Sequence, residues 1–306
     1  MIWGYEMGAI IKETAVSSDE NISSSIDHAV NAAQQCILNS GIDKNDIDLI
    51  INIGIYRDEN ISEPAMAPLI QKRLGINTNY SKGRNTFSFD LINGGCGFLY
   101  AARVVDSLFK NNAIRKALIV SSDMHPSQKQ VADFPFTHIG AAVLLEKSET
   151  YRKGFQEFGF RTAKNDYDGI TGYNDIYKCG NDGRNRVIID VSKDYSSRLK
   201  KFTVDSLKVF YQKYDAAGLI DVSKLKLLTS VPARGFAKSI VDSISAMKEN
   251  KNPVICLYDE YGDPHSSALS IAFHTAFKER RIEKDDLVLF IGAGSGLTVA
   301  AGLYIV

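Results

Sequence analysis

The chain has 306 residues, about twice a typical ~150-residue domain, so two domains or one duplicated unit are expected. Its 36 Lys and Arg residues balance 36 Asp and Glu residues. Zero net charge argues against a general nucleic-acid-binding or polybasic membrane-binding protein. A hydrophobic content of 44% with 24% charged residues is typical of a globular protein and excludes a disordered or fibrous chain.

No apolar run approaches the ~20 residues that span a bilayer, and the first residues lack the basic and apolar regions of a secretion signal. We therefore expect a cytoplasmic protein. The four cysteines lie far apart, without the paired spacing of a disulfide framework or a zinc site. They are Cys36, Cys96, Cys179 and Cys256. We predict no metal site and expect any functional cysteine to act as a thiol.

In chain order, a predicted helix over residues 26–38 leads into an apolar strand over residues 47–54. A strand ending at Asp90 follows, then a turn of small residues and an apolar-periodic helix over residues 97–110. A buried strand over residues 117–120 completes this first set. Strands alternating with helices favour an α/β protein with helices on both faces of its sheets.

Residues 151–185 are rich in Gly, Asn, Asp and Tyr and predict a loop or lid. After them the first set repeats, with helices over residues 204–214 and 266–278 and strands over residues 225–231 and 287–290. The sequence therefore predicts two duplicated α/β halves with mixed sheets, one over residues 1–155 and one over residues 156–306.

Cys96 stands between glycines after a strand and at the start of a helix. Flanking glycines allow a sharp turn and close approach of a substrate. A helix N-terminus stabilises a thiolate and offers free N–H groups as oxyanion donors. Cys96 is therefore a candidate nucleophile. The alternative is a small buried residue in a tight turn, and the sequence favours neither.

Several segments resemble the thiolase superfamily, in particular its β-ketoacyl-acyl-carrier-protein synthase III branch. The segment Phe87–Phe98 and the strand Ala117–Asp123 resemble the nucleophile region of that family. Tyr261–Ala268 resembles its His/Tyr-Gly-Asn-Thr-Ser-Ala motif, and Arg281–Thr298 resembles its Gly-rich closing segment. The resemblance covers almost the whole chain and implies a layered αβαβα architecture.

By this resemblance, Cys96 matches the acyl-accepting cysteine, and its N–H and that of Gly296 match the oxyanion hole. The chain departs from the family at two places. The catalytic histidine of the family corresponds to Ala233, after Pro232, and the asparagine corresponds to Asp263. Alanine cannot transfer a proton, so the usual decarboxylative condensation is in doubt.

Two residues are candidates to replace the missing catalytic histidine. Relatives that join two acyl chains carry a glutamate at the place of Glu63, and in an acyl tunnel this carboxylate could act as a base. The alternative is an acid that favours the start of the helix after Pro64. His265 takes the place of Cys96 in the repeat and could approach the nucleophile. The alternative for His265 is a polar residue that caps the following helix.

Other candidates carry less weight. Lys238 matches a basic position that helps hold phosphopantetheine or a carrier protein, with an exposed helix lysine as the alternative. His138 lies where the family has a glycine-rich run and is interpreted as structural. Cys36, Cys179 and Cys256 are interpreted as bystanders.

The resemblance implies a condensing enzyme or acyltransferase. It would take an acyl group from an acyl-carrier-protein or CoA thioester onto Cys96 and pass it to a second substrate, in secondary-metabolite or fatty-acid-derived biosynthesis. Glu63 would be the base if the acceptor is a carbon nucleophile. Asp263 with His265 would deprotonate the acceptor if it is a hydroxyl or an amine. We expect no permanently bound cofactor, and a homodimer or a heterodimer with a related synthase. The alternatives are a catalytically impaired accessory subunit of a heteromeric complex and a thioester hydrolase.

Overall fold

The computed structural model describes residues 8–79, 83–150, 153–164, 169–221, 224–231, 234–243, 254–255 and 258–306. Pro232 and Ala233, where the family histidine was expected, lie outside the described residues, and so does Cys256.

The first sheet is built from strands that lie between residues 9 and 147, in the spatial order β1-β5-β4-β2-β3. β2 pairs in parallel with both β3 and β4, whereas β5 runs antiparallel to β4 and β1. The strands are β1 (Ala9–Ser17), β2 (Leu49–Asn52), β3 (Phe87–Asp90), β4 (Lys116–Asp123) and β5 (Ile139–Lys147).

The second sheet is built from strands that lie between residues 154 and 305, in the order β10-β9-β11-β12-β6. β9 pairs in parallel with β10 and β11, whereas β12 runs antiparallel to β11 and β6. The strands are β6 (Gly154–Thr162), β9 (Leu225–Thr229), β10 (Val254–Ile255), β11 (Leu287–Gly294) and β12 (Thr298–Ile305). Read from β6, this order repeats the first sheet strand for strand, so the predicted duplicated α/β fold with mixed sheets is confirmed.

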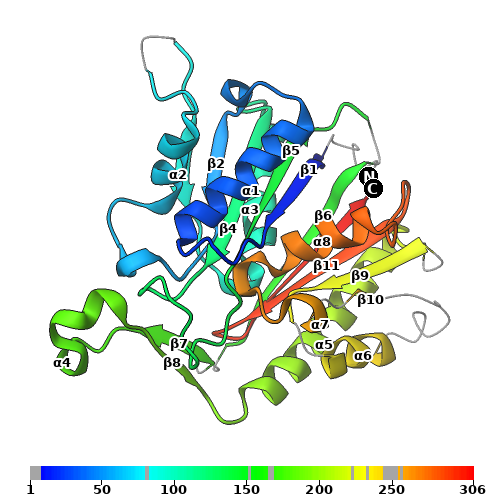
Figure 1. Cartoon of the computed structure of the whole chain (residues 1–306). Helices are drawn as coiled ribbons and strands as arrows, with labels where there is room; N and C mark the ends of the chain where they lie inside the picture. Colours follow the sequence, from blue (N-terminus) through cyan, green and yellow to red (C-terminus); the bar gives the residue numbers. More distant parts are fainter. Residues whose placement is uncertain are drawn as a thin grey trace.

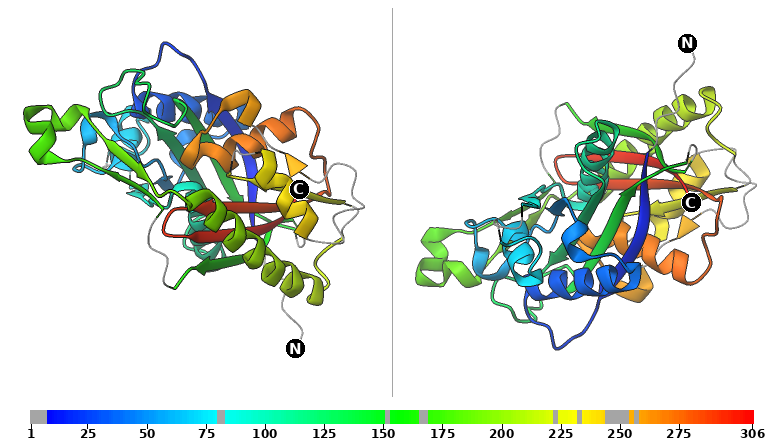
Figure 2. Two further views of the ribbon diagram at one scale, coloured as in Figure 1. Left: turned by 90° about the horizontal axis from the view of Figure 1, so that it is seen from below. Right: turned by 90° about the horizontal axis from the view of Figure 1, so that it is seen from above.

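Helices form three layers around the two sheets (Figures 1 and 2). α3 and α8 share one buried cluster with residues of both sheets, whereas α1 with α2 and α5 with α6 cover the outer faces. The helices are α1 (Ser25–Ser40), α2 (Met66–Leu74), α3 (Gly97–Lys110), α5 (Tyr195–Ala216), α6 (Arg234–Ser243), α7 (Tyr258–Tyr261) and α8 (Ala268–Lys278). The architecture is therefore the predicted αβαβα sandwich.

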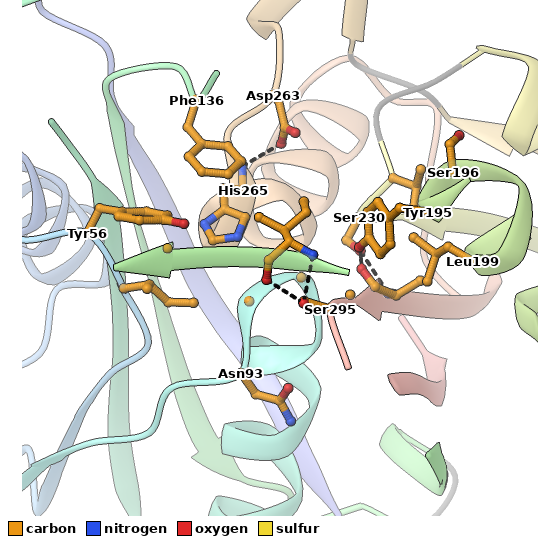
Figure 3. Close-up of a pocket in the computed structure, with 18 of the residues that line it drawn as sticks. Tyr56, Asn93, Phe136, Tyr195, Ser196, Leu199, Ser230, Asp263, His265 and Ser295 are labelled. Carbon is orange, nitrogen blue, oxygen red and sulfur yellow. Dashed lines mark hydrogen bonds between the residues drawn. The ribbon is translucent and has the colours of Figure 1, made fainter. Parts of the chain in front are cut away.

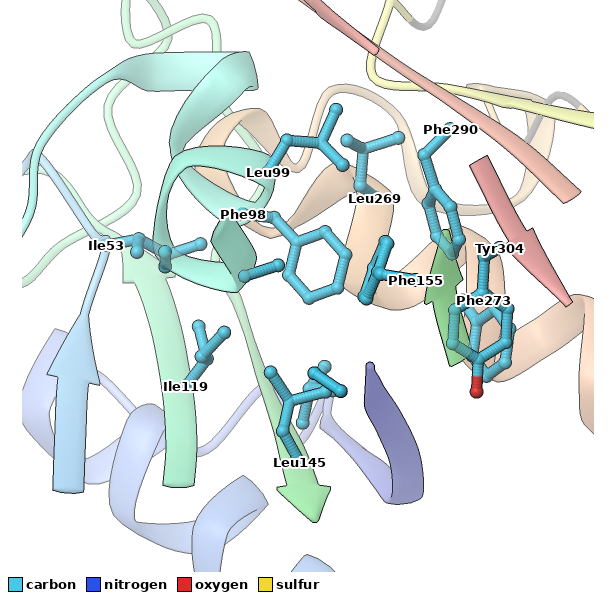
Figure 4. Close-up of a cluster of buried hydrophobic side chains, with 14 of the residues drawn as sticks. Ile53, Phe98, Leu99, Ile119, Leu145, Phe155, Leu269, Phe273, Phe290 and Tyr304 are labelled. Carbon is cyan, nitrogen blue, oxygen red and sulfur yellow. The ribbon is translucent and has the colours of Figure 1, made fainter. Parts of the chain in front are cut away.

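The central cluster joins the halves through large apolar side chains (Figure 4). Phe98 and Leu99 of α3 pack with Leu269 of α8 and with Phe290 of β11, and each is at most 1% exposed. Burying side chains of this size stabilises a fold by about 1.5–3 kcal/mol each. α3 and α8 are apolar on several faces because sheets cover them from both sides.

Each central helix begins at a one-turn 3₁₀ segment. The turn Gly94–Cys96 leads into α3, and the turn His265–Ser267 leads into α8. The two turns contact each other at the junction of the halves. Glycine in the first turn permits close packing, because a Cβ at Gly95 would lie 2.6 Å from the carbonyl oxygen of Ala293.

Residues 151–185 differ from the predicted loop, because β6 is a strand of the second sheet. The remaining described part forms an arm that projects from the body (Figure 1, lower left). The arm consists of the hairpin β7 (Ile170–Tyr173) and β8 (Ile188–Val191), the short helix α4 (Ile176–Cys179) and the 3₁₀ segment Gly180–Asn185.

The arm is held to the first half by hydrogen bonds from one amide group and by an ion pair between Arg184 and Glu59 at 3.5 Å. The Asn60 side chain donates to the carbonyl oxygens of Gly183 at 2.9 Å, Arg184 at 3.3 Å and Arg186 at 2.7 Å. At the base of the arm, Ile170 exchanges hydrogen bonds with the Ser295 hydroxyl. The arm therefore bridges the two halves. None of the described helices combines the length and the apolar character needed to cross a membrane.

Candidate active site

A cavity of about 350 Å³ opens where the two 3₁₀ turns and the arm meet (Figure 3). Both halves contribute to its wall, which mixes aromatic side chains with a few polar groups, as is usual for ligand sites. The described lining is Ile55, Tyr56, Asn93, Gly94, Gly95, Phe136, Ile170, Gly172, Tyr195, Ser196, Leu199, Ser230, Val231, Phe236, Asp263, His265, Ala293, Gly294 and Ser295.

A histidine of the cavity wall pairs with an aspartate that is buried behind it. His265 Nδ1 is 3.1 Å from Asp123 Oδ2, and the side chains are 15% and 0% exposed. The other ring nitrogen of His265, Nε2, lies 3.5 Å from the position that a Cβ at Gly94 would occupy. Nε2 is therefore turned toward the glycine turn that lines the cavity. A carboxylate that orients one nitrogen and leaves the other free is the arrangement of a general base.

Asp123 lies at the end of β4, and four donors surround it. It accepts the N–H groups of Ile55 and Tyr56 at 2.7 Å each, the Ser266 N–H at 3.1 Å and the Ser266 hydroxyl at 2.5 Å. Burial alone would raise its pKa, but the His265 charge and these hydrogen bonds outweigh burial and lower the pKa of Asp123. The carboxylate therefore stays ionised.

The same pairing acts on the imidazole. Burial opposes protonation of His265, but the Asp123 charge and hydrogen bond outweigh burial, so the pKa of His265 is raised above its usual value. The ring is held in place by stacking on Phe136, with centroids 4.1 Å apart and planes 22° apart. Its backbone has a φ of 48°, a region that histidine rarely adopts and that the Asp123 and Asp263 contacts stabilise.

Asp263 lies two residues before His265 and also faces the cavity (Figure 3). Its Oδ1 accepts the His265 N–H at 2.9 Å. Burial raises the pKa of Asp263, and the nearby Asp123 charge adds to this effect. The structure thus brings together two of the predicted site residues, Asp263 and His265.

Cys96 is not part of this wall. Its side chain is 0% exposed within the central core, and its thiol donates to the Thr298 carbonyl oxygen at 3.5 Å. Burial raises the thiol pKa to about 12. Its backbone N–H donates to the Asn93 carbonyl oxygen at 2.9 Å, so it is not a free oxyanion donor. Neither the thiol nor the N–H of Cys96 lines the described cavity, and its role as the acyl-accepting nucleophile stays a prediction.

The residues of this turn that line the cavity are Gly94 and Gly95. A Cβ at Gly95 would lie 2.6 Å from the Ala293 carbonyl oxygen and 2.7 Å from Ser230 Oγ, so the space beside Gly95 is filled. The turns also correct the predicted repeat. Both occupy three residues before a central helix, and this places His265 opposite Gly94 and not opposite Cys96.

The other predicted residues lie elsewhere. Glu63 is exposed and lines a separate surface hollow beside the arm, so it does not join His265 within this chain. Gly296 lies in the turn between β11 and β12, next to the cavity residue Ser295, but is not in the described cavity wall. Lys238 is exposed on α6 and pairs with Asp242 at 3.3 Å. His138 packs against Phe134 before β5, and burial lowers its pKa.

Three residues of the site were not predicted. Asp123 ends a buried strand, which is a position where functional side chains gather in α/β sheets, and this is the signal that could have found it. Tyr195 and Ser230 gave no comparable signal, since each becomes a wall residue only through the packing of the second half. Among the described residues, no three His, Cys, Asp or Glu side chains gather as ligands for a metal ion.

The comparisons with known proteins agree with the fold. Residues 231–305 match the family model of the 3-oxoacyl-[acyl-carrier-protein (ACP)] synthase III C-terminal region. Curated β-ketoacyl-[acyl-carrier-protein] synthases III are similar over most of the chain. That of Clostridium botulinum (strain Okra / Type B1) is 25% identical and covers 94% of this chain and 85% of its own length. That of Wolbachia pipientis wMel is 27% identical, with coverages of 89% and 81%.

Solved structures of similar fold have lower sequence identity to this chain than the curated relatives have. A crystal structure of Xanthomonas campestris OleA superposes with a TM-score of 0.78 at 14% identity, covering 98% of both chains. The 3-oxoacyl-[acyl-carrier-protein] synthase III of Aquifex aeolicus VF5 superposes with a TM-score of 0.75 at 18% identity, covering 98% of this chain and 100% of its own. These likenesses establish the fold.

Proposed function

Because the chain is similar to β-ketoacyl-[acyl-carrier-protein] synthases III, we propose that it transfers an acyl group from a carrier-protein or CoA thioester directly to a hydroxyl or amine acceptor. His265 is the general base in this proposal. The observation that carries it is the pairing of His265 with the buried Asp123 at a cavity that His265 lines and the Cys96 thiol does not.

The proposed step uses groups of the cavity wall. His265 Nε2 accepts the proton of the acceptor, whose oxygen or nitrogen attacks the thioester carbonyl carbon. The carbon–sulfur bond breaks, and the protonated His265 returns a proton to the leaving thiolate. Asp123 stabilises the imidazolium formed between these events.

Tyr195 is the proposed donor to the thioester carbonyl oxygen, where negative charge develops. It begins α5 and lies across the cavity from His265 (Figure 3). Burial raises the pKa of Tyr195 well above its usual value, so the hydroxyl keeps its proton at neutral pH.

The proposal is tested by mixing the chain with butyryl-CoA and an alcohol or amine, then measuring free CoA and product by mass spectrometry. We expect Cys96→Ala to keep most of the transfer activity, as should the matched variant Cys36→Ala, which alters an equally buried thiol. His265→Ala should lose transfer. Intact mass showing a butyryl adduct on wild type that Cys96→Ala abolishes, together with loss of transfer, would favour the acyl-cysteine route and reject direct transfer.

An accessory role is the second proposal, and one surface supports it. β3 is the edge strand of the first sheet, with Phe87 66% exposed, and Ile92 just beyond β3 is 49% exposed. Exposed apolar residues on a strand edge favour pairing with another chain. We propose a dimer through this edge, with a second copy or with a related synthase, and carrier-protein contact near Lys238. Light scattering of wild type and Phe87→Lys tests the dimer, and acyl transfer by the purified chain alone excludes a purely accessory role.

A further inference from the structure

Negative charges outnumber positive charges at the cavity. Asp263 and His265 line the cavity and Asp123 is buried behind His265, whereas no lysine or arginine occurs among the described residues of the cavity wall. Even a protonated His265 supplies one positive charge against two negative charges. The described wall therefore has a deficit of positive charge.

Asp263 is held rigidly at this wall. Its own carbonyl oxygen accepts the Thr137 N–H at 2.8 Å, and its Oδ1 accepts the His265 N–H at 2.9 Å. The preceding Gly262 has a φ of 65°, and a Cβ there would lie 2.6 Å from Thr137 Oγ1. The backbone of this segment thus has little freedom to turn the carboxylate away from the cavity.

A half-buried carboxylate is poorly compensated by neutral neighbours, because charge removed from water is costly unless it is paired. The imidazole is already paired with Asp123, whose Oδ2 lies 3.1 Å from Nδ1 of the ring. Tyr195, across the cavity, is neutral. A cation in the cavity would supply the missing partner, whereas a carboxylate or phosphate on the acceptor would be repelled.

Building on the acyl transfer proposed above, we propose that the acceptor is a primary amine that enters as its ammonium form and is held by Asp263. The aromatic side chains Tyr56 and Phe136 accommodate the apolar part of the amine beside His265. The product is then an amide rather than an ester.

The proton balance is complete with the groups present. The ammonium bound at Asp263 gives one proton to His265, which releases it to solvent, and the neutral amine attacks the thioester carbonyl carbon. The new carbon–nitrogen bond forms as the carbon–sulfur bond breaks. The second proton lost by nitrogen passes through His265 to the thiolate. The sum is ammonium plus thioester giving amide, thiol and one proton.

The test compares two probes of matched shape, benzylamine and benzyl alcohol, as acceptors for butyryl-CoA at neutral pH. We expect the KM for benzylamine to be at least about tenfold below that for benzyl alcohol, because a hydrogen bond between charged groups is stronger than one between neutral groups. Asp263→Asn, which keeps an oxygen for the His265 N–H, should raise the benzylamine KM about tenfold and change the benzyl alcohol KM much less. Asp27→Asn, at a surface ion pair with Arg73, is the control.

Thermal melting of each variant confirms folding, and His265→Ala corrects for uncatalysed aminolysis. Equal KM values for the two probes, or an Asp263→Asn effect that is the same for both, would reject amine recognition while leaving acyl transfer intact. Failure of wild type to form either the amide or the ester would reject the acyl transfer itself.

Discussion

The two 3₁₀ turns at the centre of the molecule occupy equivalent places in the duplicated halves and have opposite chemistry. The turn Gly94–Cys96 presents glycine to the cavity and keeps its thiol in the core. The turn His265–Ser267 presents an imidazole and ties itself to Asp123 through Ser266. In the family that this chain resembles, the turn of the first half carries the nucleophile, whereas the proposed general base of this chain, His265, lies in the turn of the second half.

Equivalent places in the two turns thus carry side chains of different chemistry. In both turns the first residue meets the other turn and the third is fully buried, with Cys96 and Ser267 each 0% exposed. A side chain reaches the cavity only from those positions of the 3₁₀ turn that face the cavity. The chemistry of each turn follows from which side chain holds those positions.

The largest expected effect comes from removing the imidazole of the second turn. His265→Ala should lower kcat/KM for acyl transfer by about 10²–10⁴-fold, the usual contribution of a general base. Steady-state assays of free CoA release measure this loss. A decrease of less than about fivefold in a folded variant would place the chemistry elsewhere.

Asp123→Asn should lower the rate less, by about 10–100-fold, because a charge-assisted hydrogen bond contributes about 1.5–3 kcal/mol. The pKa of His265 is raised by Asp123, and a base works only when unprotonated. The rate should therefore fall as pH decreases through this raised pKa, and the variant should shift that acid limb to lower pH. The pH–rate profiles of wild type and Asp123→Asn measure this shift. An acid limb at the same pH in both proteins would contradict the pairing of His265 with Asp123.

The glycine turn is tested through stability. Gly95→Ala should reduce the free energy of unfolding by about 1–3 kcal/mol, because its Cβ would meet the Ala293 carbonyl oxygen and the Ser230 side chain. Gly235→Ala on α6, where nothing lies within 4 Å, should be neutral or stabilising by up to ~1 kcal/mol. Urea unfolding of both variants measures the difference, and equal values would show that the turn is not tightly packed.

The smallest effect is expected at the surface. Lys238→Ala removes an ion pair whose side chains are 78% and 55% exposed, so stability should change by less than about 0.5 kcal/mol. If Lys238 contacts an acidic carrier protein, the KM for an acyl-carrier-protein substrate should rise about twofold to fivefold at low salt, with the KM for butyryl-CoA unchanged. A KM that changes for neither substrate would remove this residue from the proposed contact surface.

The fold followed from the sequence because its signals are local and repeated. The apolar strand over residues 117–120 is part of β4, and the periodic helix over residues 97–110 is α3 with the same bounds. The predicted helix over residues 204–214 lies within the longer α5. The two strands of the arm escaped prediction, since each has only four residues and this leaves little periodicity to detect.

The site was harder to predict, because it depends on the direction of single side chains. Cys96 and Gly95 are neighbours in the sequence, yet one faces the core and the other the cavity. Composition and motif spacing do not separate them. The pairing of His265 with Asp123 joins residues 142 positions apart and exists only once both sheets are packed.

Asp123 receives backbone and hydroxyl donors from Ile55, Tyr56 and Ser266, which lie in different halves of the chain. Asp123 therefore has two structural roles, since it joins the two halves of the chain and orients the imidazole of His265. A descendant that abandoned catalysis would still need an aspartate at this position but could drift freely at His265. Substitution rates at Asp123 and His265 across related chains would thus indicate whether a lineage has kept catalysis or only the fold.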